Sequence, residues 1–447
     1  MTIRRFAVLC AAALLAACGG GGDGGGSAPP LSCSVADQNV WVREHFDQRY
    51  FWYALAPRPD PAVYSTVQDY FDASLFGGDA TFPSDRWSYK GLTADFDRFF
   101  GDGVNRGYGL SVAGLEVEGR PDLPLRVRYI EPKSDAAAKG LQRGDTIVSI
   151  NGRLAAEYVA DNDYDVLVPN NVGDQLQLVV RGPGGERSVT LVAQDYRLTP
   201  VTGARVVATP LGRKVGYVVI KDLIDQVDGP LDAAFAQFRA EGVADVVVDL
   251  RYNGGGYVRT GANVASHIGG ARTAGQDYAR LLYNDRGWNA NQSVPFTNPA
   301  NALGLTRAYV LSGPRTCSAS EQVINGLRGA GVEVVQIGDV SCGKPVGFNP
   351  QDGGCGDTYS IVTFESVNAR NEGRYFDGLA PQCEVADDLD QPLGATAEGL
   401  LSAALQYADS GQCPTTQPPQ PLSARRAGAT LRRMKVEPGE FQGMVMR

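Results

Sequence analysis

The spacing of apolar and polar residues changes twice along the first half of the chain. In residues 33–105 aromatic side chains recur at mixed helical spacing, which predicts a small helical region with these aromatics in its core. In residues 106–196 short runs of β-type composition alternate with Gly and Pro turns, which predicts a compact β-rich module. Its expected strands are 125–129, 146–150, 176–180 and 188–192.

Residues 197–413 alternate strand-like and helix-like segments, which predicts an α/β core of layered sheet and helices. Strands are expected at 215–220, 244–250, 307–311 and 332–337, and helices at 231–239, 258–267, 318–327 and 397–407. The run 244–250 is almost entirely apolar, which is typical of a strand buried on both faces.

The first residues have the layout of an export signal. Arg4 and Arg5 precede an apolar run, 6–17, that is too short to span a bilayer, so residues 1–17 are expected to be a signal peptide. A signal peptide directs the chain out of the cytoplasm.

The end of this signal resembles the lipobox of bacterial lipoproteins, because small residues lead directly to Cys18. The resemblance implies that Cys18 is lipidated, with residues 18–32 as a Gly-rich tether to the membrane. An ordinary secretory signal with an incidental Cys is the alternative. Gly19 favours the outer over the inner membrane, so we expect a cell-envelope protein that faces the periplasm.

Charge narrows the classes of partner. Loss of residues 1–17 removes two Arg, which leaves 39 basic and 50 acidic residues and a formal charge of −11. With this net negative charge we do not expect the protein to bind nucleic acid. Basic residues gather only in residues 414–447, predicted to be a disordered tail, with contact to anionic lipid headgroups as an alternative role.

Cysteine usage fits an exported protein. Six Cys remain beyond the signal and the lipid site, and an even number in an oxidising compartment predicts three disulfides. No Cys-x-x-Cys pair occurs and the only His residues are His45 and His267, so we expect no metal and no cofactor.

The β-rich module contains the segments Tyr129-Ile130-Glu131-Pro132, 134–141 and 144–152, and over its whole length it resembles a PDZ domain. The resemblance implies that Gly107, Tyr108, Gly109 and Leu110 form the loop that holds the terminal carboxylate of a bound peptide. Ser111 and Val112 would then start the strand edge to which the peptide adds. A purely structural turn is the alternative.

Two segments of the core carry candidate chemistry. Asp249-Leu250-Arg251-Tyr252-Asn253-Gly254-Gly255-Gly256 ends a buried strand in a Gly loop before a helix, where backbone N–H groups favour a developing oxyanion. Thr316-Cys317-Ser318-Ala319-Ser320-Glu321 follows a strand and opens a helix, and Lys344 follows the next strand. This order of elements can bring a hydroxyl and an amine together.

These motifs, with Asp377-Gly378-Leu379-Ala380-Pro381, resemble the C-terminal processing (tail-specific) peptidases from the PDZ module to about Tyr407. The resemblance implies a crotonase/Clp-like core with an inserted PDZ domain. It also implies Ser318 as nucleophile, Lys344 as general base, and oxyanion donors at Ala319 and Gly255, chosen over Gly254. The alternative is that Ser318 only caps a helix and Lys344 lies at the surface.

One position departs from that family. Members with a Ser-Lys-Gln triad carry Gln four residues after the Lys, whereas this chain has Phe348 there. Asn349 and Gln351 are candidates for orienting the base by proximity alone, and a dyad without a third side chain is equally compatible with the sequence.

Cys317 and Cys342 flank the two candidate catalytic residues, so we expect a disulfide between them, with a thiol nucleophile at Cys317 as the alternative. The remaining pairs are then expected to be Cys355–Cys383 and Cys33–Cys413.

The favoured function is cleavage of exported or unfolded polypeptides near free apolar C-termini, admitted by the PDZ module. A binding protein for hydrophobic peptides or ligands on the same fold is one alternative, and retention of Ser318 and Lys344 argues against it. An acyl-transferring or hydratase enzyme is another, and the PDZ module argues against that. The sequence leaves the oligomeric state open.

Overall fold

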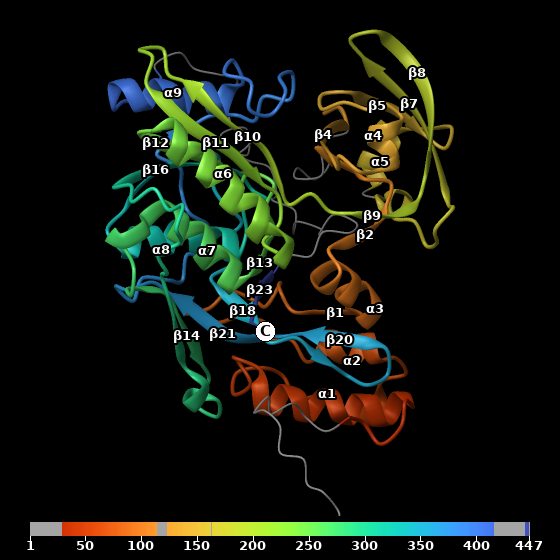
Figure 1. Cartoon of the computed structure of the whole chain (residues 1–447). Helices are drawn as coiled ribbons and strands as arrows, with labels where there is room; N and C mark the ends of the chain where they lie inside the picture. Colours follow the sequence, from red (N-terminus) through yellow and green to blue (C-terminus); the bar gives the residue numbers. More distant parts are fainter. Residues whose placement is uncertain (1–28, 114–122, 162, 415–442, 447) are drawn as a thin grey trace, which may run out of the picture.

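A computed structural model describes residues 29–113, 123–161, 163–414 and 443–446 of the chain (Figure 1). Within these residues no helix is long and apolar enough to cross a bilayer. The signal peptide, Cys18 and most of the tether fall outside them. The β-rich module stands to one side of the α/β core, and the N-terminal helices lie under the core (Figure 1).

The central sheet of the core has the strand order β10-β11-β12-β16-β17-β22. All neighbours are parallel except β10, which runs antiparallel to β11. The bounds are β10 Val201–Ala208, β11 Lys214–Ile220, β12 Asp245–Asp249, β16 Arg307–Ser312, β17 Glu333–Gly338 and β22 Cys383–Glu384. The four strands expected from the sequence for this core are therefore present in one sheet.

Helices cover both faces of the central sheet because its strands are apolar on both sides. Val246 and Val248 pack on one face against α6 (Asp228–Glu241), α7 (Val258–Gly269) and α8 (Ala319–Gly329). Val247 packs on the other face against α9 (Gly399–Ser410). The predicted layers of sheet and helix are confirmed.

A second sheet, β13-β23-β18-β21-β14-β15, completes the core. Its bounds are β13 Gly255–Tyr257, β23 Gly443–Val445, β18 Val346–Phe348, β21 Val362–Val367, β14 Asp277–Tyr283 and β15 Gln292–Pro295. The predicted tail thus differs from the structure at 443–446, where Met444 and Val445 are buried because their apolar side chains enter the core. The rest of that tail after Pro414 lies outside the described residues.

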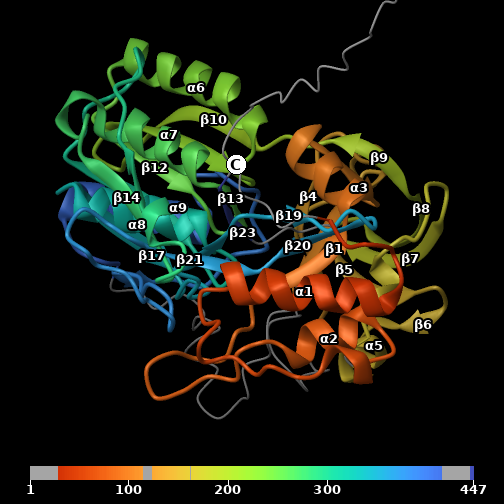
Figure 2. The same cartoon turned by 90° about the horizontal axis from the view of Figure 1, so that it is seen from below.

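The N-terminal region packs beneath this sheet. Helices α1 (Val35–Arg49) and α2 (Val67–Ala73) lie beside a small sheet of β1 (Tyr89–Leu92), β20 (Asp357–Ser360) and β19 (Gln351–Asp352) (Figures 1 and 2). The aromatics of this region are core side chains, as predicted, and they share one cluster with Val346 and Phe348 of β18. The region therefore supports the strand that follows Lys344.

The β-rich module contains a sheet of order β3-β4-β5-β7-β8, and its four expected strands are confirmed. The bounds are β3 Leu110–Ala113, β4 Arg126–Ile130, β5 Thr146–Ile150, β7 Gln175–Gly182 and β8 Gly185–Val192, with helices α4 Asp135–Ala138 and α5 Ala155–Asp161. A two-stranded neck of β2 (Val104–Gly107) and β9 (Gln194–Arg197) connects the module to the rest of the chain.

The structure contains three disulfides, Cys317–Cys342, Cys33–Cys355 and Cys383–Cys413. The first is the expected pair beside the candidate catalytic residues. The expected pairs Cys355–Cys383 and Cys33–Cys413 are wrong, because Cys33 at the start of α1 meets the loop before β20, and Cys413 follows α9 onto β22.

Candidate active site

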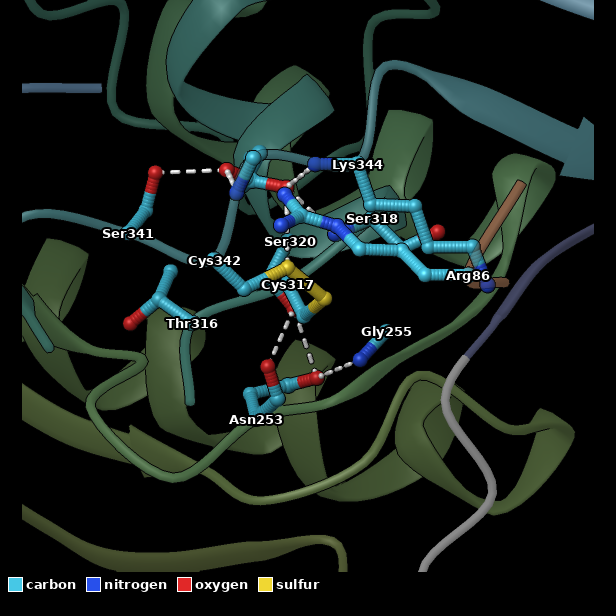
Figure 3. Close-up of a disulfide and its surroundings, with 12 residues drawn as sticks. Arg86, Asn253, Gly255, Thr316, Cys317, Ser318, Ser320, Ser341, Cys342 and Lys344 are labelled. Carbon is cyan, nitrogen blue, oxygen red and sulfur yellow. Dashed lines mark hydrogen bonds between the residues drawn. A yellow bond between two sulfur atoms is a disulfide. The ribbon is translucent and has the colours of Figure 1, made fainter. Parts of the chain in front are cut away.

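Ser318 lies in a sharp turn between β16 and the first residue of α8 (Figure 3). Its backbone has φ 61° and ψ −118°, a conformation that a residue with a side chain adopts only under strain. The side chain is buried, and Oγ has no hydrogen-bond partner within the part of the chain that the structure describes. A strained serine at a strand-to-helix turn is the geometry of a nucleophile elbow.

Glu321 fixes this turn against the segment that carries Lys344. Its Oε2 accepts hydrogen bonds from the backbone N–H groups of Ser318 at 2.8 Å and Lys344 at 2.9 Å. Its Oε1 accepts from Gly343 N–H at 2.8 Å and from the Ser341 hydroxyl at 2.5 Å. Burial raises the pKa of Glu321, and these four donors oppose that effect.

The Lys344 side chain is 1% exposed, so the alternative of a surface lysine is wrong. Burial lowers the pKa of Lys344 to about 7, against the opposing carboxylates of Asp85 and Glu321. Its Nζ lies 3.9 Å from the centroid of the Phe348 ring, a cation–π contact that also favours the charged form. Burial outweighs these effects that favour the charged form, so the lysine can be neutral near pH 7.

Asn253 connects the Gly loop to the Ser318 turn. Its backbone carbonyl accepts from Cys317 N–H at 3.0 Å, and its Oδ1 accepts from the Ser320 hydroxyl at 2.7 Å and from Gly255 N–H at 2.9 Å (Figure 3). The N–H of Gly255, expected as an oxyanion donor, is thus engaged by Asn253 in this conformation. The N–H of Ala319, the other expected donor, is at the first position of α8, where helices leave N–H groups unpaired.

The Cys317–Cys342 disulfide joins the residue before Ser318 to the segment two residues before Lys344 (Figure 3). Cys317 therefore offers no free thiol as nucleophile. Its sulfur, that of Cys342 and the Glu321 carboxylate lie close enough together to hold an ion, but both sulfur atoms are in the disulfide. The group offers no thiolate ligand for a metal.

The two side chains considered for orienting the base have other partners. Asn349 Oδ1 accepts from Tyr283 at 3.0 Å and from Thr363 at 2.8 Å. Gln351 lies in β19 opposite Tyr359. Phe348, at the sequence position that the resemblance gives to Gln, has its ring centroid 3.9 Å from Lys344 Nζ.

Sequence reasoning missed Glu321, Asn253 and Asp85 as parts of the site. Glu321 is three residues after Ser318, a capping-box spacing that gives a signal for its bond to the Ser318 N–H. Asp85 comes from the N-terminal region, where it accepts from Tyr50 and Ser88 at 2.6 Å each. No local pattern relates it to Lys344.

The expected carboxylate-binding loop of the β-rich module joins β2 to β3. Gly109 has φ +80°, and its carbonyl accepts from Glu131 N–H at 2.9 Å, while the Tyr108 carbonyl accepts from Ala136 N–H at 3.1 Å. The strand after the loop, β3, is the end strand of its sheet, as an edge that receives a peptide must be.

The fold defines a class: an α/β peptidase core with a PDZ domain and a helical N-terminal region. Three family models match the chain in turn, "Peptidase S41 N-terminal domain" at residues 37–89, "PDZ domain" at 100–194 and "Peptidase family S41" at 214–385. The chain belongs to peptidase family S41.

Relatives of known identity are distant. The chain is 27% identical over 263 residues to the chloroplastic C-terminal processing peptidase of Tetradesmus obliquus, covering 54% of this chain and 56% of that one. It is 23% identical to the carboxy-terminal processing protease CtpB of Bacillus subtilis, covering 56% and 50%. The matched stretch thus spans about half the length of these relatives.

A crystal structure of a protein from Bacteroides fragilis assigned to the S41 proteases shares the fold. The TM-score is 0.65 at 25% identity, and the alignment covers 83% of this chain and 97% of that one. The structure of the photosystem II D1 C-terminal processing protease has a TM-score of 0.50 at 20% identity, covering 79% and 93%, which supports the fold alone.

Proposed function

We propose that this chain is a serine endopeptidase that cleaves exported or unfolded polypeptides near their C-termini, with Ser318 as nucleophile and Lys344 as general base. The observation that carries the proposal is a strained, buried serine whose backbone N–H shares Glu321 Oε2 with that of a buried lysine, whose pKa is lowered to about 7. A structural lysine has no need of such an environment, and a base does.

The proposed chemistry begins with neutral Lys344. Its Nζ takes the Ser318 hydroxyl proton as Oγ bonds to the scissile carbonyl carbon, and the carbonyl π electrons move to oxygen. Collapse of this intermediate breaks the C–N bond, and the lysine ammonium returns the proton to the leaving amine. Water then hydrolyses the ester on Ser318 with the same lysine as base.

The developing oxyanion needs donors beside Ser318. The N–H of Ala319 and the positive end of the α8 dipole serve it from the helix, and we assign the second donor to the Gly loop at Gly255. Gly255 must then exchange its bond to Asn253 for one to the oxyanion. Substrate binding would supply that change.

Histidine has no comparable position. His45 stacks on Trp41 within α1, and burial lowers its pKa to about 3. His267 Nδ1 lies 2.9 Å from the Asn263 carbonyl, and its Nε2 faces Asp232 at 3.5 Å. His45 thus packs within α1 and His267 is held between α7 and α6, whereas Lys344 shares Glu321 Oε2 with Ser318, which supports lysine as the base.

The proposal places the enzyme in the cell envelope, anchored through lipidated Cys18 to the outer membrane on its periplasmic side. Disulfides at the core and the N-terminal region fit an oxidising compartment. The PDZ loop Gly107–Leu110 would hold free apolar C-termini while β3 receives the peptide as an added strand.

The deciding experiment compares wild type with Ser318→Ala on an unfolded reporter that ends in an apolar, free C-terminus. We expect cleavage near that terminus by the wild type and none by the variant. Binding of the reporter by both proteins without cleavage by either would instead support the binding-protein alternative.

A further inference from the structure

Strand β23 inserts a distant piece of the chain into the sheet at the active site. It lies between β13 and β18 and runs parallel to both (Figure 1). Gly443 is opposite Gly255, and its N–H donates to the Gly254 carbonyl at 3.2 Å. At the other edge Met446 N–H donates to the Phe348 carbonyl at 3.0 Å.

Both flanking strands begin at the proposed machinery. Strand β13 starts at Gly255 of the oxyanion loop, and β18 starts two residues after Lys344. A Cβ added at Gly255 would collide with the Gly443 carbonyl oxygen and lie 3.1 Å from Cβ of Ser318. A peptide carbonyl of β23 therefore lies beside the nucleophile, where a scissile carbonyl must come.

The backbone fit around β23 is close. A Cβ added at Gly347 of β18 would lie 2.6 Å from the Met444 carbonyl oxygen. Met444 and Val445 are 0% and 1% exposed, and they join two apolar clusters on opposite sides of the strand, with Phe364 in the first and Tyr257 in the second. Backbone pairing with pockets for alternate side chains is how sheets recognise an added peptide strand.

We propose that the space between β13 and β18 is the peptide-binding slot of the peptidase and that Gly443–Met446 occupies it in cis as an autoinhibitory strand. The inference rests on the proposed function, because it assigns the slot to substrate. The slot takes an extended segment with glycine beside Ser318 and apolar residues at the next two positions. Substrate must displace the chain's own segment to reach the nucleophile.

A weak strand is sufficient for such inhibition. A tethered segment commonly has an effective concentration of about 1 mM, so an intrinsic Kd of about 0.1 mM leaves about one slot in ten open. Expelling the segment should then raise kcat/KM about tenfold, mainly through KM.

Val445→Lys tests this in the full chain, because an ammonium in a 1% exposed apolar site opposes insertion of the strand. Val63→Lys is the matched control, since Val63 is 73% exposed. We expect about tenfold higher kcat/KM on the unfolded reporter for Val445→Lys and no change for Val63→Lys. Equal or lower activity of a folded Val445→Lys protein would show that β23 is only structural.

Hydrogen exchange on the full chain gives a second measurement, which does not depend on whether Val445→Lys folds. A synthetic peptide of residues 441–447 is added in excess to Ser318→Ala protein. Displacement predicts faster exchange at the amides of Met444 and Val445. If the peptide binds and exchange at these amides is unchanged, the proposal that Gly443–Met446 occupies the slot is wrong. If wild-type and Val445→Lys proteins both fold but neither cleaves the reporter, the proposed function is wrong as well.

Discussion

The backbone N–H groups of Ser318 and Lys344 donate to the same atom, Glu321 Oε2, at 2.8 and 2.9 Å. The two residues come from different strand ends, and one buried carboxylate oxygen sets their spacing. The Cys317–Cys342 disulfide connects the same two segments a second time. The backbone of the Ser318 turn is thus held to the Lys344 segment twice, by a hydrogen-bond centre and by a covalent bond.

Glu321→Gln should change both the stability of the protein and the pH dependence of its activity, and the two effects can be measured separately. The amide loses one acceptor atom and points N–H at backbone N–H, so we expect unfolding free energy to fall by about 2 kcal/mol. The variant also removes a negative charge that favours protonated Lys344, so the pH at which activity rises should move lower. Loss of stability with an unchanged pH profile in kcat/KM would contradict a role at the base.

The pH dependence follows from Lys344. Its folded pKa of about 7 lies below its ordinary value of 10.5, so activity should rise with pH to a plateau, with its midpoint near 7. The same comparison gives the sign for stability: the unfolded chain binds the extra proton, so this lysine destabilises the fold most below pH 7 and progressively less up to about pH 10. Rate profiles and denaturant titrations at several pH values measure the two effects.

Two substitutions at this position sharpen that prediction. Lys344→Arg keeps a charge that cannot be lost and should lower kcat by about 100-fold or more. Lys344→Met should be equally inactive yet more stable than wild type at pH 6, because it buries no amine. Substantial cleavage by a folded Lys344→Arg protein would show that another residue is the general base.

The disulfide beside the site should matter more for activity than its stability effect suggests. Cys317–Cys342 and Cys383–Cys413 close loops of similar length, with separations of 25 and 30 residues, so removing either pair should cost about 3 kcal/mol. Only the first pair connects the segments of the proposed nucleophile, Ser318, and the proposed base, Lys344. Replacing both cysteines of each pair by Ala should lower kcat for the first far more than for the second, and equal losses would refute the positioning role.

If the loop Gly107–Leu110 binds a terminal carboxylate, the enzyme should cleave reporters with a free C-terminus faster than the same reporters with an amidated C-terminus. Both Gly109 and Gly140 have a positive φ, so alanine is strained at either position. At Gly109 the added Cβ would also collide with the Ser134 side chain, whereas at Gly140 it would enter open space. We expect wild type and Gly140→Ala to prefer reporters with a free carboxylate, and Gly109→Ala to lose that preference. Equal rates on both reporters for the wild type would show that the loop is structural.

The parts of the fold that follow from local pattern were predictable, and those that depend on distant contacts were not. The apolar run at Val246, Val247 and Val248 specifies a strand buried on both faces, and the structure has it between helices on each side. Ser318 and Lys344 each follow a parallel strand, and such ends meet at one sheet edge.

Nothing local relates Gly443 to Gly255 or Cys33 to Cys355, since each pair is joined by tertiary contact alone. The basic and Pro-rich composition of residues 414–447 predicts a disordered tail and hides its short apolar end, which contains Gly443. The two incorrect disulfide pairs have the same origin, because spacing along a chain does not determine connectivity.

Phe348→Leu tests the ring that stands where the resemblance places Gln. Leucine keeps the site apolar and should cost about 1 kcal/mol of stability, but it removes the contact of the ring with Lys344 Nζ at 3.9 Å. Since that contact favours the ammonium, the midpoint of the activity rise should fall by about one pH unit. Phe235→Leu, in a fully buried position of α6, should lose similar stability and keep the wild-type profile. Identical midpoints for all three proteins would mean that the Phe348 ring only fills space beside the lysine.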